Sequence, residues 1–348
     1  MKRRPIFERA SPLWSAAIDR RFCGAFAAGG VSWCSPENRG DAFFSRAESG
    51  DKSPHSKRSL AFGAVTITAV LAMMVGSAGV LPASGAGSKP HAPTGAAAPA
   101  PRPAIPSVKA LADQLPCTAD YFDVAGCPAF LLRPKDKPGA APMPWVWYAP
   151  VIGHPNPSHA WMLRQWLSKG IGMAGVDVGE SFGSPRGRAV YGALWRTLAT
   201  RYGMSERPCL LPQSRGGLML YNWAAENPTR VASIAGIYTV CDLRSYPGLE
   251  RACGAYAMTA AEVEAHLAEH NPIDRLAPLA KAGVPILHVH GDADRVVPLE
   301  KNSGELARRY RALGGPMRLI VVPGKGHQVA TEFFQCQELV DFVIAHAR

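Results

Sequence analysis

Three short segments place a serine, an aspartate and a histidine in an order that suits nucleophilic catalysis. Ser214 follows a hydrophobic run in LLPQSRGG, Asp294 lies in HGDADRVVP, and His327 ends VVPGKGH. A serine hydroxyl is a weak nucleophile at neutral pH, so it needs a histidine to accept its proton and an acid to hold that histidine in one tautomer. The segments therefore predict Ser214 as nucleophile, His327 as base and Asp294 as acid.

Other residues near Asp294 admit different interpretations. Asp292 lies in the same loop, where we expect it to cap the turn, and Asp242 follows the preceding predicted strand as an alternative acid. With His288 and His290, the two aspartates of the loop form an HxHxDxD pattern of the kind that can bind a catalytic metal. Because both histidines lie inside a predicted strand that packs against helices, we expect no metal and no other cofactor.

Backbone amides close to the serine are the expected donors to the oxyanion of a tetrahedral intermediate. One is the amide of Arg215, the residue after the nucleophile. The other is the amide of Val151 or Ile152, in the loop that follows the predicted strand 145–149.

The Arg215 side chain has two interpretations that the sequence leaves open. A guanidinium beside the nucleophile can bind a developing oxyanion or a substrate carboxylate. It can equally pair with an acidic neighbour such as Glu180 or Asp242. Arg215, Glu180 and Asp242 are therefore the candidates for substrate binding.

Alternating strands and helices position these residues. The predicted strands are 145–149, 171–177, 208–211, 231–238, 285–290 and 318–322, and the predicted helices are 161–169, 189–202, 218–226, 303–313 and 332–346. Near-continuous apolar strands that alternate with helices predict an α/β fold with a mostly parallel sheet, flanked by helices on both faces. Ligands of such sheets bind at the carboxyl ends of the strands, where the serine, the aspartate and the histidine all lie.

One interval between strands is too long for a simple connection. We expect residues 239–283 to form a small cap insertion over the catalytic edge. Thr259 and Glu262 form a capping box that predicts a helix running to about His270.

The serine segment resembles the nucleophile elbow of the α/β-hydrolase superfamily, small-x-Ser-x-Gly, with Pro212 standing where glycine is usual. GDADRVVP resembles the G-x-x-D-x-V-x-P segment that carries the acid in that superfamily, and the order serine, acid, histidine also agrees. Ser214-Arg215 is similar to the Ser-Arg pair of glucuronoyl esterases, and residues 145–348 resemble prolyl-oligopeptidase-type serine hydrolases. The resemblance implies the α/β-hydrolase fold and a serine hydrolase activity.

The N-terminal third has the composition of an export region. Residues 1–58 are polar and without periodicity, so we expect a disordered extension or a stretch upstream of the true translation start. Residues 59–83 contain an almost uncharged run, 60–81, which basic residues precede and small residues follow. This pattern predicts a signal peptide or membrane anchor. A Pro- and Ala-rich linker, 84–107, then precedes the hydrolase domain, 108–348.

The net charge and the cysteines add two expectations. The chain carries a formal charge of +11, but its positive residues are scattered, which argues against nucleic-acid binding. Export permits disulfides, and Cys117, Cys127, Cys241 and Cys253 lie in segments that we expect to be loops. Sequence alone leaves their pairing and the oligomeric state open.

These observations predict an exported serine hydrolase that cleaves carboxylic esters, including carbohydrate esters, through an acyl-enzyme. We expect unrestricted access to the site, because the chain has no room for the propeller that prolyl-oligopeptidase-type enzymes often carry. The alternatives are a prolyl-oligopeptidase-like serine peptidase, a metallohydrolase that uses the HxHxDxD segment, and a non-catalytic binding domain of the same fold.

Overall fold

The computed structural model describes residues 101–135 and 142–347. The predicted extension and signal segment lie outside these residues, as does most of the predicted linker. Within the described residues, no helix is both long enough and apolar enough to cross a bilayer.

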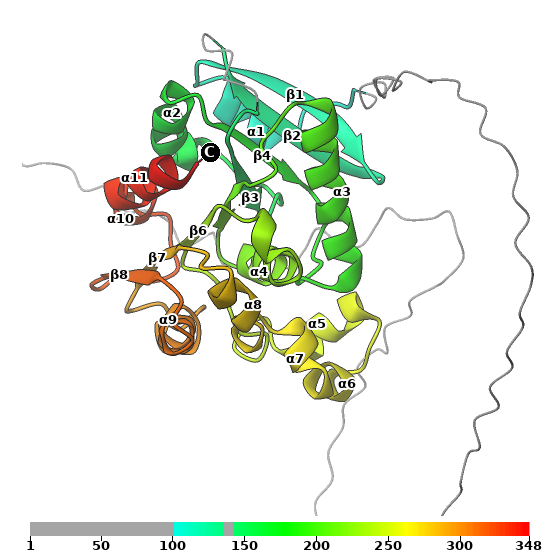
Figure 1. Ribbon diagram of the computed structural model, residues 1–348, viewed down its shortest axis with the longest axis vertical. Coiled ribbons are helices and arrows are strands. Elements are labelled where there is room, and N and C mark those ends of the chain that lie inside the picture. Colours follow the sequence, from blue (N-terminus) through cyan, green and yellow to red (C-terminus); the bar gives the residue numbers. More distant parts are fainter. Residues whose placement is uncertain (1–100, 136–141, 348) are drawn as a thin grey trace, which may run out of the picture. The chain divides into compact units, whose positions relative to one another are not determined.

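An open sheet of eight strands forms the centre of the fold, in the order β1-β2-β4-β3-β5-β6-β7-β8 (Figure 1). The first two strands pair antiparallel with each other, β2 pairs antiparallel with β4, and the remaining pairs are parallel. The strands are β1 (Cys117–Val124), β2 (Cys127–Pro134), β3 (Trp145–Ala149), β4 (Gly172–Val176), β5 (Cys209–Pro212), β6 (Ser233–Ile237), β7 (Ile286–Gly291) and β8 (Met317–Val322).

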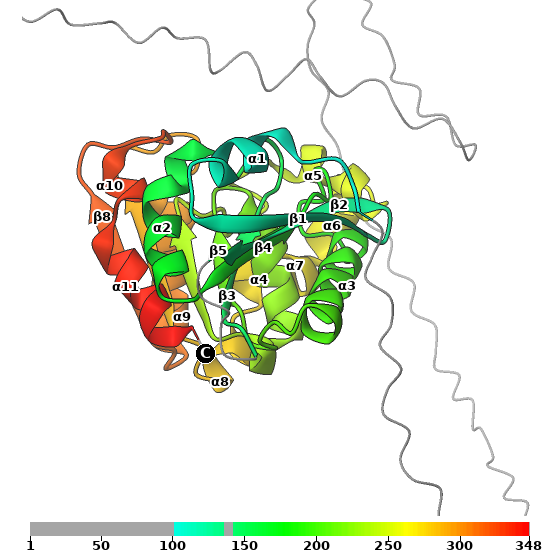
Figure 2. The same ribbon diagram turned by 90° about the horizontal axis from the view of Figure 1, so that it is seen from above.

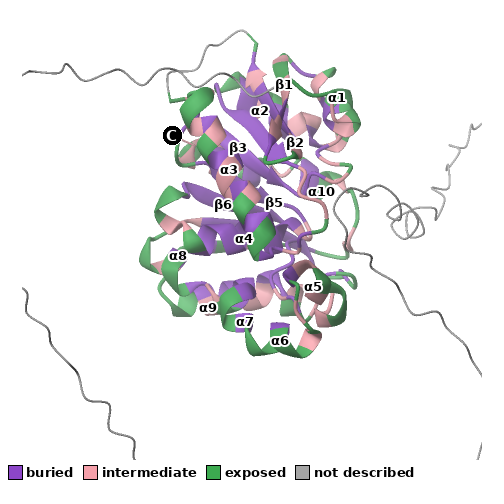
Figure 3. Cartoon of the chain, turned by 90° about the vertical axis from the view of Figure 1, so that its right-hand side faces the viewer, coloured by how far each residue is buried: buried purple, intermediate pink, exposed green. Residues whose placement is uncertain are grey.

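Helices cover both faces of the sheet, as predicted. In β3, Trp145 and Trp147 pack on one face and Val146 and Tyr148 on the other, because successive side chains of a strand point to opposite sides. One face is covered by α3 (Pro185–Arg201), α4 (Gly216–Glu226), α8 (Ala277–Lys281) and α9 (Ser303–Ala312). The other is covered by α1 (Pro106–Ala112), α2 (Ala160–Ser168), α10 (Thr331–Phe334) and α11 (Gln337–His346). Figure 2 shows α2 and α11 across the sheet from α3 and α4, and Figure 3 shows the strands buried between the two layers.

A hairpin that the sequence analysis missed adds two strands at one edge of the sheet. Ala125 and Gly126 have φ values of 51° and 83°, and this two-residue turn joins β1 to β2. Cys117 and Cys127 are the first residues of these strands, so the prediction that they lie in loops was wrong. They stand at opposite ends of the hairpin, and all six described cysteines are free thiols.

Two helical predictions need correction. The described fold includes residues before 108, because Arg102 donates to the carbonyl of Tyr121 and α1 begins at Pro106. The predicted helix 332–346 is two helices, α10 and α11, with a break at Gln335 and Cys336. The capping box of Thr259 does open a helix, but the predicted continuous helix is divided into α6 (Ala260–Ala265) and α7 (Leu267–His270).

The insertion between β6 and β7 contains α5 (Leu249–Tyr256), α6, α7 and α8. Figure 1 shows α5, α6 and α7 gathered in one group. Their apolar side chains pack with Leu218, which lies four residues after Ser214, and with Val297, which lies three residues after Asp294. The hydroxyl of Tyr256 in α5 also donates to the carbonyl of Phe182, in the loop after β4. The insertion therefore packs onto loops at the carboxyl edge of the sheet.

Candidate active site

Ser214 lies in a sharp turn between β5 and α4. Its φ is 50°, in the left-handed region that non-glycine residues rarely adopt. A Cβ added to Gly216 would lie 2.0 Å from the carbonyl oxygen of Ala149. One added to Gly217 would lie 2.0 Å from the carbonyl oxygen of Val240. The close approach of the backbone therefore requires glycine at both positions, and this tight turn projects Ser214 beyond the end of its strand.

Ser214, His327 and Asp294 form a continuous line of hydrogen bonds. The Oγ of Ser214 lies 2.8 Å from Nε2 of His327. The Nδ1 of His327 lies 2.8 Å from Oδ2 of Asp294. With its proton on Nδ1, the imidazole can accept the serine proton at Nε2. The Asp294 side chain is fully buried and His327 is 19% exposed, so the base is accessible while its acid partner is shielded.

Asp294 is held as a carboxylate by the donors around it. Its Oδ1 accepts hydrogen bonds from the amides of Val296, at 3.0 Å, and Val297, at 2.8 Å. Burial raises the pKa of Asp294, but hydrogen bonds from His290 and His327 outweigh burial and hold this pKa well below its ordinary value. The carboxylate is therefore ionised at neutral pH and can stabilise a protonated His327.

Asp292, which we expected to cap its own turn, accepts a hydrogen bond from the neighbouring loop. Its Oδ1 accepts a hydrogen bond of 2.6 Å from the amide of Gly324, in the loop that leads to His327. Asp292 therefore joins the loops after β7 and β8.

Asp242, the other alternative acid, belongs to a different cluster. Its Oδ1 accepts hydrogen bonds from Nδ2 of Asn271, at 3.0 Å, and from the amide of Arg244, at 3.1 Å. No hydrogen bond among the described residues joins Asp242 to His327. The structure therefore places Asp242 in a bracing role within the insertion.

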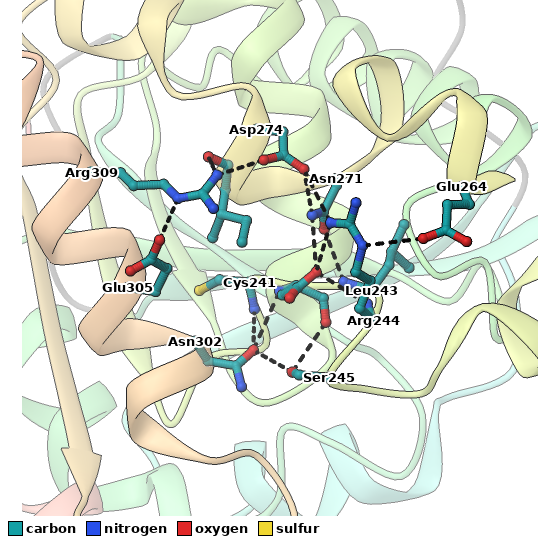
Figure 4. Close-up of polar contacts among 12 residues, drawn as sticks. Cys241, Leu243, Arg244, Ser245, Glu264, Asn271, Asp274, Asn302, Glu305 and Arg309 are labelled. Carbon is teal, nitrogen blue, oxygen red and sulfur yellow. Dashed lines mark hydrogen bonds and ion pairs between the residues drawn. The ribbon is translucent and has the colours of Figure 1, made fainter.

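A polar cluster that includes Asn271, Asp274 and Asn302 fastens the insertion to α9 (Figure 4). Asn302, just before α9, accepts hydrogen bonds at Oδ1 from the amide of Cys241, at 2.9 Å, and from the hydroxyl of Ser245, at 3.0 Å. Asn271 donates to both Asp242 and Asp274, and Arg309 of α9 pairs with Asp274. We call the group Asp242, Asn271, Asp274, Asn302 and Arg309 the cap anchor.

The three amides expected to stabilise an oxyanion remain available. Among the described residues, the amides of Arg215, Val151 and Ile152 make no hydrogen bond within the protein. The loop that carries Val151 and Ile152 begins at Pro150, next to Ala149, whose carbonyl lies against Gly216 of the serine turn. The two sources of donors are therefore adjacent.

Arg215 forms an ion pair with Glu180, its Nε lying 2.8 Å from Oε1. Of the two interpretations that the sequence left open, this is the pairing with an acidic neighbour. Burial raises the pKa of Glu180 and the charge of Arg215 partly offsets that rise. The pKa of His154, which the sequence analysis did not single out, is lowered by burial and by the charge of Arg215. Ionisable groups from three loops therefore gather beside the serine turn.

Gln213, the residue before the nucleophile, is a buried residue that the sequence analysis missed. Its Oε1 lies 2.7 Å from the hydroxyl of Tyr148 and 2.9 Å from Nε2 of His159. Its Nε2 donates to the hydroxyl of Tyr238, at 2.7 Å. The ring of Tyr238 lies 4.5 Å from that of His327. A polar residue between an apolar strand and the serine was the available sequence signal.

His288 and His290 are buried, and protein groups contact all four of their ring nitrogens. Those of His288 lie 2.7 Å from the hydroxyl of Tyr221 and 2.9 Å from that of Ser303. Those of His290 lie 2.8 Å from the hydroxyl of Ser303 and 2.8 Å from the carbonyl of Val297. The HxHxDxD pattern is therefore accounted for by hydrogen bonds.

Residues 191–346 match the model of the prolyl oligopeptidase family. A comparison with curated proteins gives no match.

Several solved structures have the same fold at low sequence identity. S-formylglutathione hydrolase from Agrobacterium tumefaciens is 16% identical with a TM-score of 0.54, over 67% of this chain and 97% of that one. Carboxyl esterase 2 from Tuber melanosporum is 15% identical with a TM-score of 0.51, over 67% and 88%. Dipeptidyl peptidase 4 from Porphyromonas gingivalis is 16% identical with a TM-score of 0.53, over 67% of this chain but 36% of the peptidase. The α/β-hydrolase fold and the resemblance to serine hydrolases of that superfamily are confirmed.

Proposed function

We propose that this α/β-hydrolase-fold protein is a serine hydrolase that cleaves carboxylic esters, with Ser214, His327 and Asp294 as its catalytic triad. The observation that carries the proposal is the unbroken line of two hydrogen bonds from Ser214 through His327 to Asp294, each 2.8 Å long. The donor order along that line is the one that nucleophilic catalysis requires.

The proposed reaction passes through an acyl-enzyme. His327 accepts the proton of Ser214 as its Oγ attacks the ester carbonyl, and Asp294 stabilises the resulting imidazolium. The amides of Arg215 and of Val151 or Ile152 donate to the tetrahedral oxyanion. His327 then passes its proton to the departing alcohol, and a water molecule activated by His327 hydrolyses the acyl-enzyme.

Two comparisons support ester rather than peptide substrates. This chain spans 97% of the S-formylglutathione hydrolase and 88% of the carboxyl esterase, but only 36% of the dipeptidyl peptidase. The likeness in fold therefore extends over most of the length of both of these hydrolases. Carbohydrate esters form our proposed substrate class, on the premise that the protein is exported through residues 59–83.

The Arg215–Glu180 pair is the proposed recognition element of the site. The Arg215 side chain is 18% exposed and that of Glu180 is 37% exposed, so a substrate can reach both. Arg215 also presents more N–H groups than a single carboxylate oxygen can use, which leaves donors for a substrate hydroxyl or carboxylate.

Labelling of the full chain with a fluorophosphonate tests the proposal. We expect the wild type to be labelled and Ser214→Ala to be unlabelled, with ester hydrolysis reduced by about four orders of magnitude or more. Ser168→Ala is the matched control, because Ser168 ends α2, just before β4 begins, and its Oγ donates to the carbonyl of Gln165. Labelling that persists in Ser214→Ala contradicts Ser214 as the nucleophile. Labelling that is absent from a folded wild type contradicts the triad and favours the non-catalytic alternative.

Peptide-bond hydrolysis is the second candidate function, and the prolyl oligopeptidase family match favours it. An ester and an amide of the same acyl group separate the two candidates. A kcat/KM for the amide that equals or exceeds that for the ester would favour the peptidase.

A further inference from the structure

A row of buried polar side chains leads through the core to Asp294. Tyr221 comes from α4, His288 and His290 from β7, and Ser303 from the start of α9, and none is more than 1% exposed. We call these four residues the histidine chain. Buried polar groups are costly unless their donors and acceptors are paired, so this row needs an explanation beyond packing.

The histidine chain contacts Asp294 through His290. The Nε2 of His290 lies 2.8 Å from the carbonyl oxygen of Val297 and 3.4 Å from Oδ2 of Asp294. Both neighbours are acceptors, so this nitrogen carries a proton. The Asp294 oxygen that it faces is the one that also accepts from His327.

The proton on Nε2 of His290 determines where the other protons of the row lie. With Nε2 protonated, the Nδ1 of a neutral His290 accepts from the hydroxyl of Ser303, at 2.8 Å. The Ser303 oxygen then accepts from Nδ1 of His288, at 2.9 Å, and the Nε2 of His288 accepts from the hydroxyl of Tyr221, at 2.7 Å. Burial, with a smaller effect of His290, lowers the pKa of His288 to about 3, so this ring is neutral as the order requires.

The reverse order is disfavoured. It would make His290 a fully buried cation, with protons on both nitrogens. It would also leave the hydroxyl proton of Tyr221 without an acceptor, because His288 is its one hydrogen-bond partner among the described residues. In the favoured order every donor has an acceptor and each hydrogen bond of the row points toward Asp294.

We propose that His290 is a positioning residue for the reaction, donating from Nε2 to Oδ2 of Asp294 while Tyr221, His288 and Ser303 fix its tautomer. This inference rests on the proposed function. Two amides already fix Oδ1 of Asp294. The N–H of His290, which Oδ2 shares at 3.4 Å with the closer carbonyl of Val297, adds a restraint on Oδ2, so the carboxylate is kept from rotating and stays aligned with His327.

Replacing His290 in the full chain tests the role through kcat. His290→Leu removes the donor, whereas His290→Gln places an amide N–H near the position of Nε2. We expect the Leu variant to lose about tenfold to a hundredfold in kcat for an ester, with KM unchanged because His290 does not touch the substrate. We expect the Gln variant to recover most of this loss.

The pH profile of kcat/KM separates positioning from simple destabilisation. His327 contacts Ser214, Asp294 and the ring of Tyr238, and of these Asp294 alone is charged. Without His290, Asp294 attracts a protonated His327 more strongly, so the acid limb of the Leu variant should move to higher pH. Equal losses in both variants with an unmoved limb, or wild-type kcat in the Leu variant, would overturn the proposal.

A measurement independent of activity examines the proton order itself. In the ¹⁵N spectrum of histidine-labelled wild type, we expect His288 as the Nδ1–H tautomer and His290 as the Nε2–H tautomer, assigned with the His290→Gln variant. The opposite tautomer for His290 would overturn the inference whether or not the protein is a hydrolase. A wild type that shows the expected tautomers but neither binds the fluorophosphonate nor cleaves esters would contradict the proposed function and, with it, the positioning role. The inferred proton order would still hold.

Discussion

The cap anchor and the histidine chain meet at two adjacent residues, Asn302 and Ser303, where α9 begins. Asn302 directs its amide oxygen to the insertion, and Ser303 directs its hydroxyl to His288 and His290. Both residues are fully buried. One turn of backbone therefore supports two polar clusters, one that fastens the insertion and one that leads to the candidate acid.

The two clusters satisfy their buried polar groups differently. The cap anchor uses charge and contact with solvent: the side chain of Asp274 is 23% exposed and that of its partner Arg309 is 36% exposed. The histidine chain is buried and, in the proton order inferred above, carries no charge before Asp294. At a solvated edge, water can serve as donor or acceptor for a charged group that lacks a protein partner. In the core, a neutral polar group is satisfied only when each proton lies between a donor and an acceptor of the protein. The difference predicts different responses to mutation, pH and salt.

Substitutions at the shared turn should have the largest effect and should separate the clusters. Asn302→Ala leaves the amide of Cys241 without its acceptor and the hydroxyl of Ser245 with the carbonyl of Asp242 alone, and we expect it to lower the free energy of unfolding by about 3 kcal/mol. Ser303→Ala should lower the free energy of unfolding by about 1–2 kcal/mol. It should also reduce kcat, because it removes the hydroxyl that holds His290 in one tautomer. Urea unfolding and ester kinetics of both variants measure these effects.

Asn302→Asp is the control for that comparison, because it keeps an acceptor oxygen for the insertion. We expect it to retain more stability than Asn302→Ala and to leave the insertion resistant to limited proteolysis. If Asn302→Ala and Ser303→Ala lose stability and kcat in the same proportion, the two clusters act as one unit and the distinction fails.

Acid should weaken the histidine chain before it weakens the charged residues of α9. The pKa of His288 falls from 6.5 to about 3 on folding, chiefly through burial, so below pH 6.5 the unfolded chain binds the extra proton. Stability is therefore lost as pH falls from 6.5 toward about 3, by at most about 1.4 kcal/mol per pH unit.

Glu305, which pairs with Arg309, also loses its contribution in acid, but at lower pH. Hydrogen bonds from Arg308 and then Arg309 lower its pKa from 4.5 to about 2, so its contribution is intact above 4.5 and lost only below it. Urea unfolding between pH 6.5 and 4.5 therefore reports His288 but not Glu305. We expect His288→Gln to flatten the pH dependence in that window and Glu305→Gln to leave it unchanged. An unchanged slope in His288→Gln would show that this ring is not neutral in the folded state.

Much of the fold, and the meeting of the three candidate triad residues, could be predicted from sequence because local patterns determine them. The buried parallel strands are apolar runs, and Ser214, Asp294 and His327 each follow one directly, so topology alone brings them to one edge. The hairpin of β1 and β2 was missed because its Ala-Gly turn lacks the usual Asn or Asp. Its antiparallel strands also lie outside the strand–helix alternation.

The buried polar partners could not be predicted because they depend on side chains from distant elements. Tyr221 and Ser303 look like ordinary residues of amphipathic helices, and their contact with His288 appears only when α4, α9 and β7 pack together. The same holds for Arg215. Its ion pair with Glu180 joins the loop after β4 to the turn after β5, and no local sequence pattern distinguishes that pairing from a substrate contact.

Salt should have the smallest effect and should act on one cluster alone. Arg309 lies 2.5 Å from Asp274 and 2.6 Å from Glu305, at a surface where dissolved ions screen charges. We expect Arg309→Gln to lose about 0.5–1 kcal/mol of stability at low ionic strength and nearly none at about 1 M salt. Tyr221→Phe removes a neutral, buried hydrogen bond, so its loss of about 1 kcal/mol should be the same at both salt concentrations. Thermal or urea unfolding of the two variants at low and high sodium chloride provides the measurement. A loss in Tyr221→Phe that shrinks with salt as much as that in Arg309→Gln would mean that the histidine chain carries charge, and the proton order inferred for it would have to be abandoned.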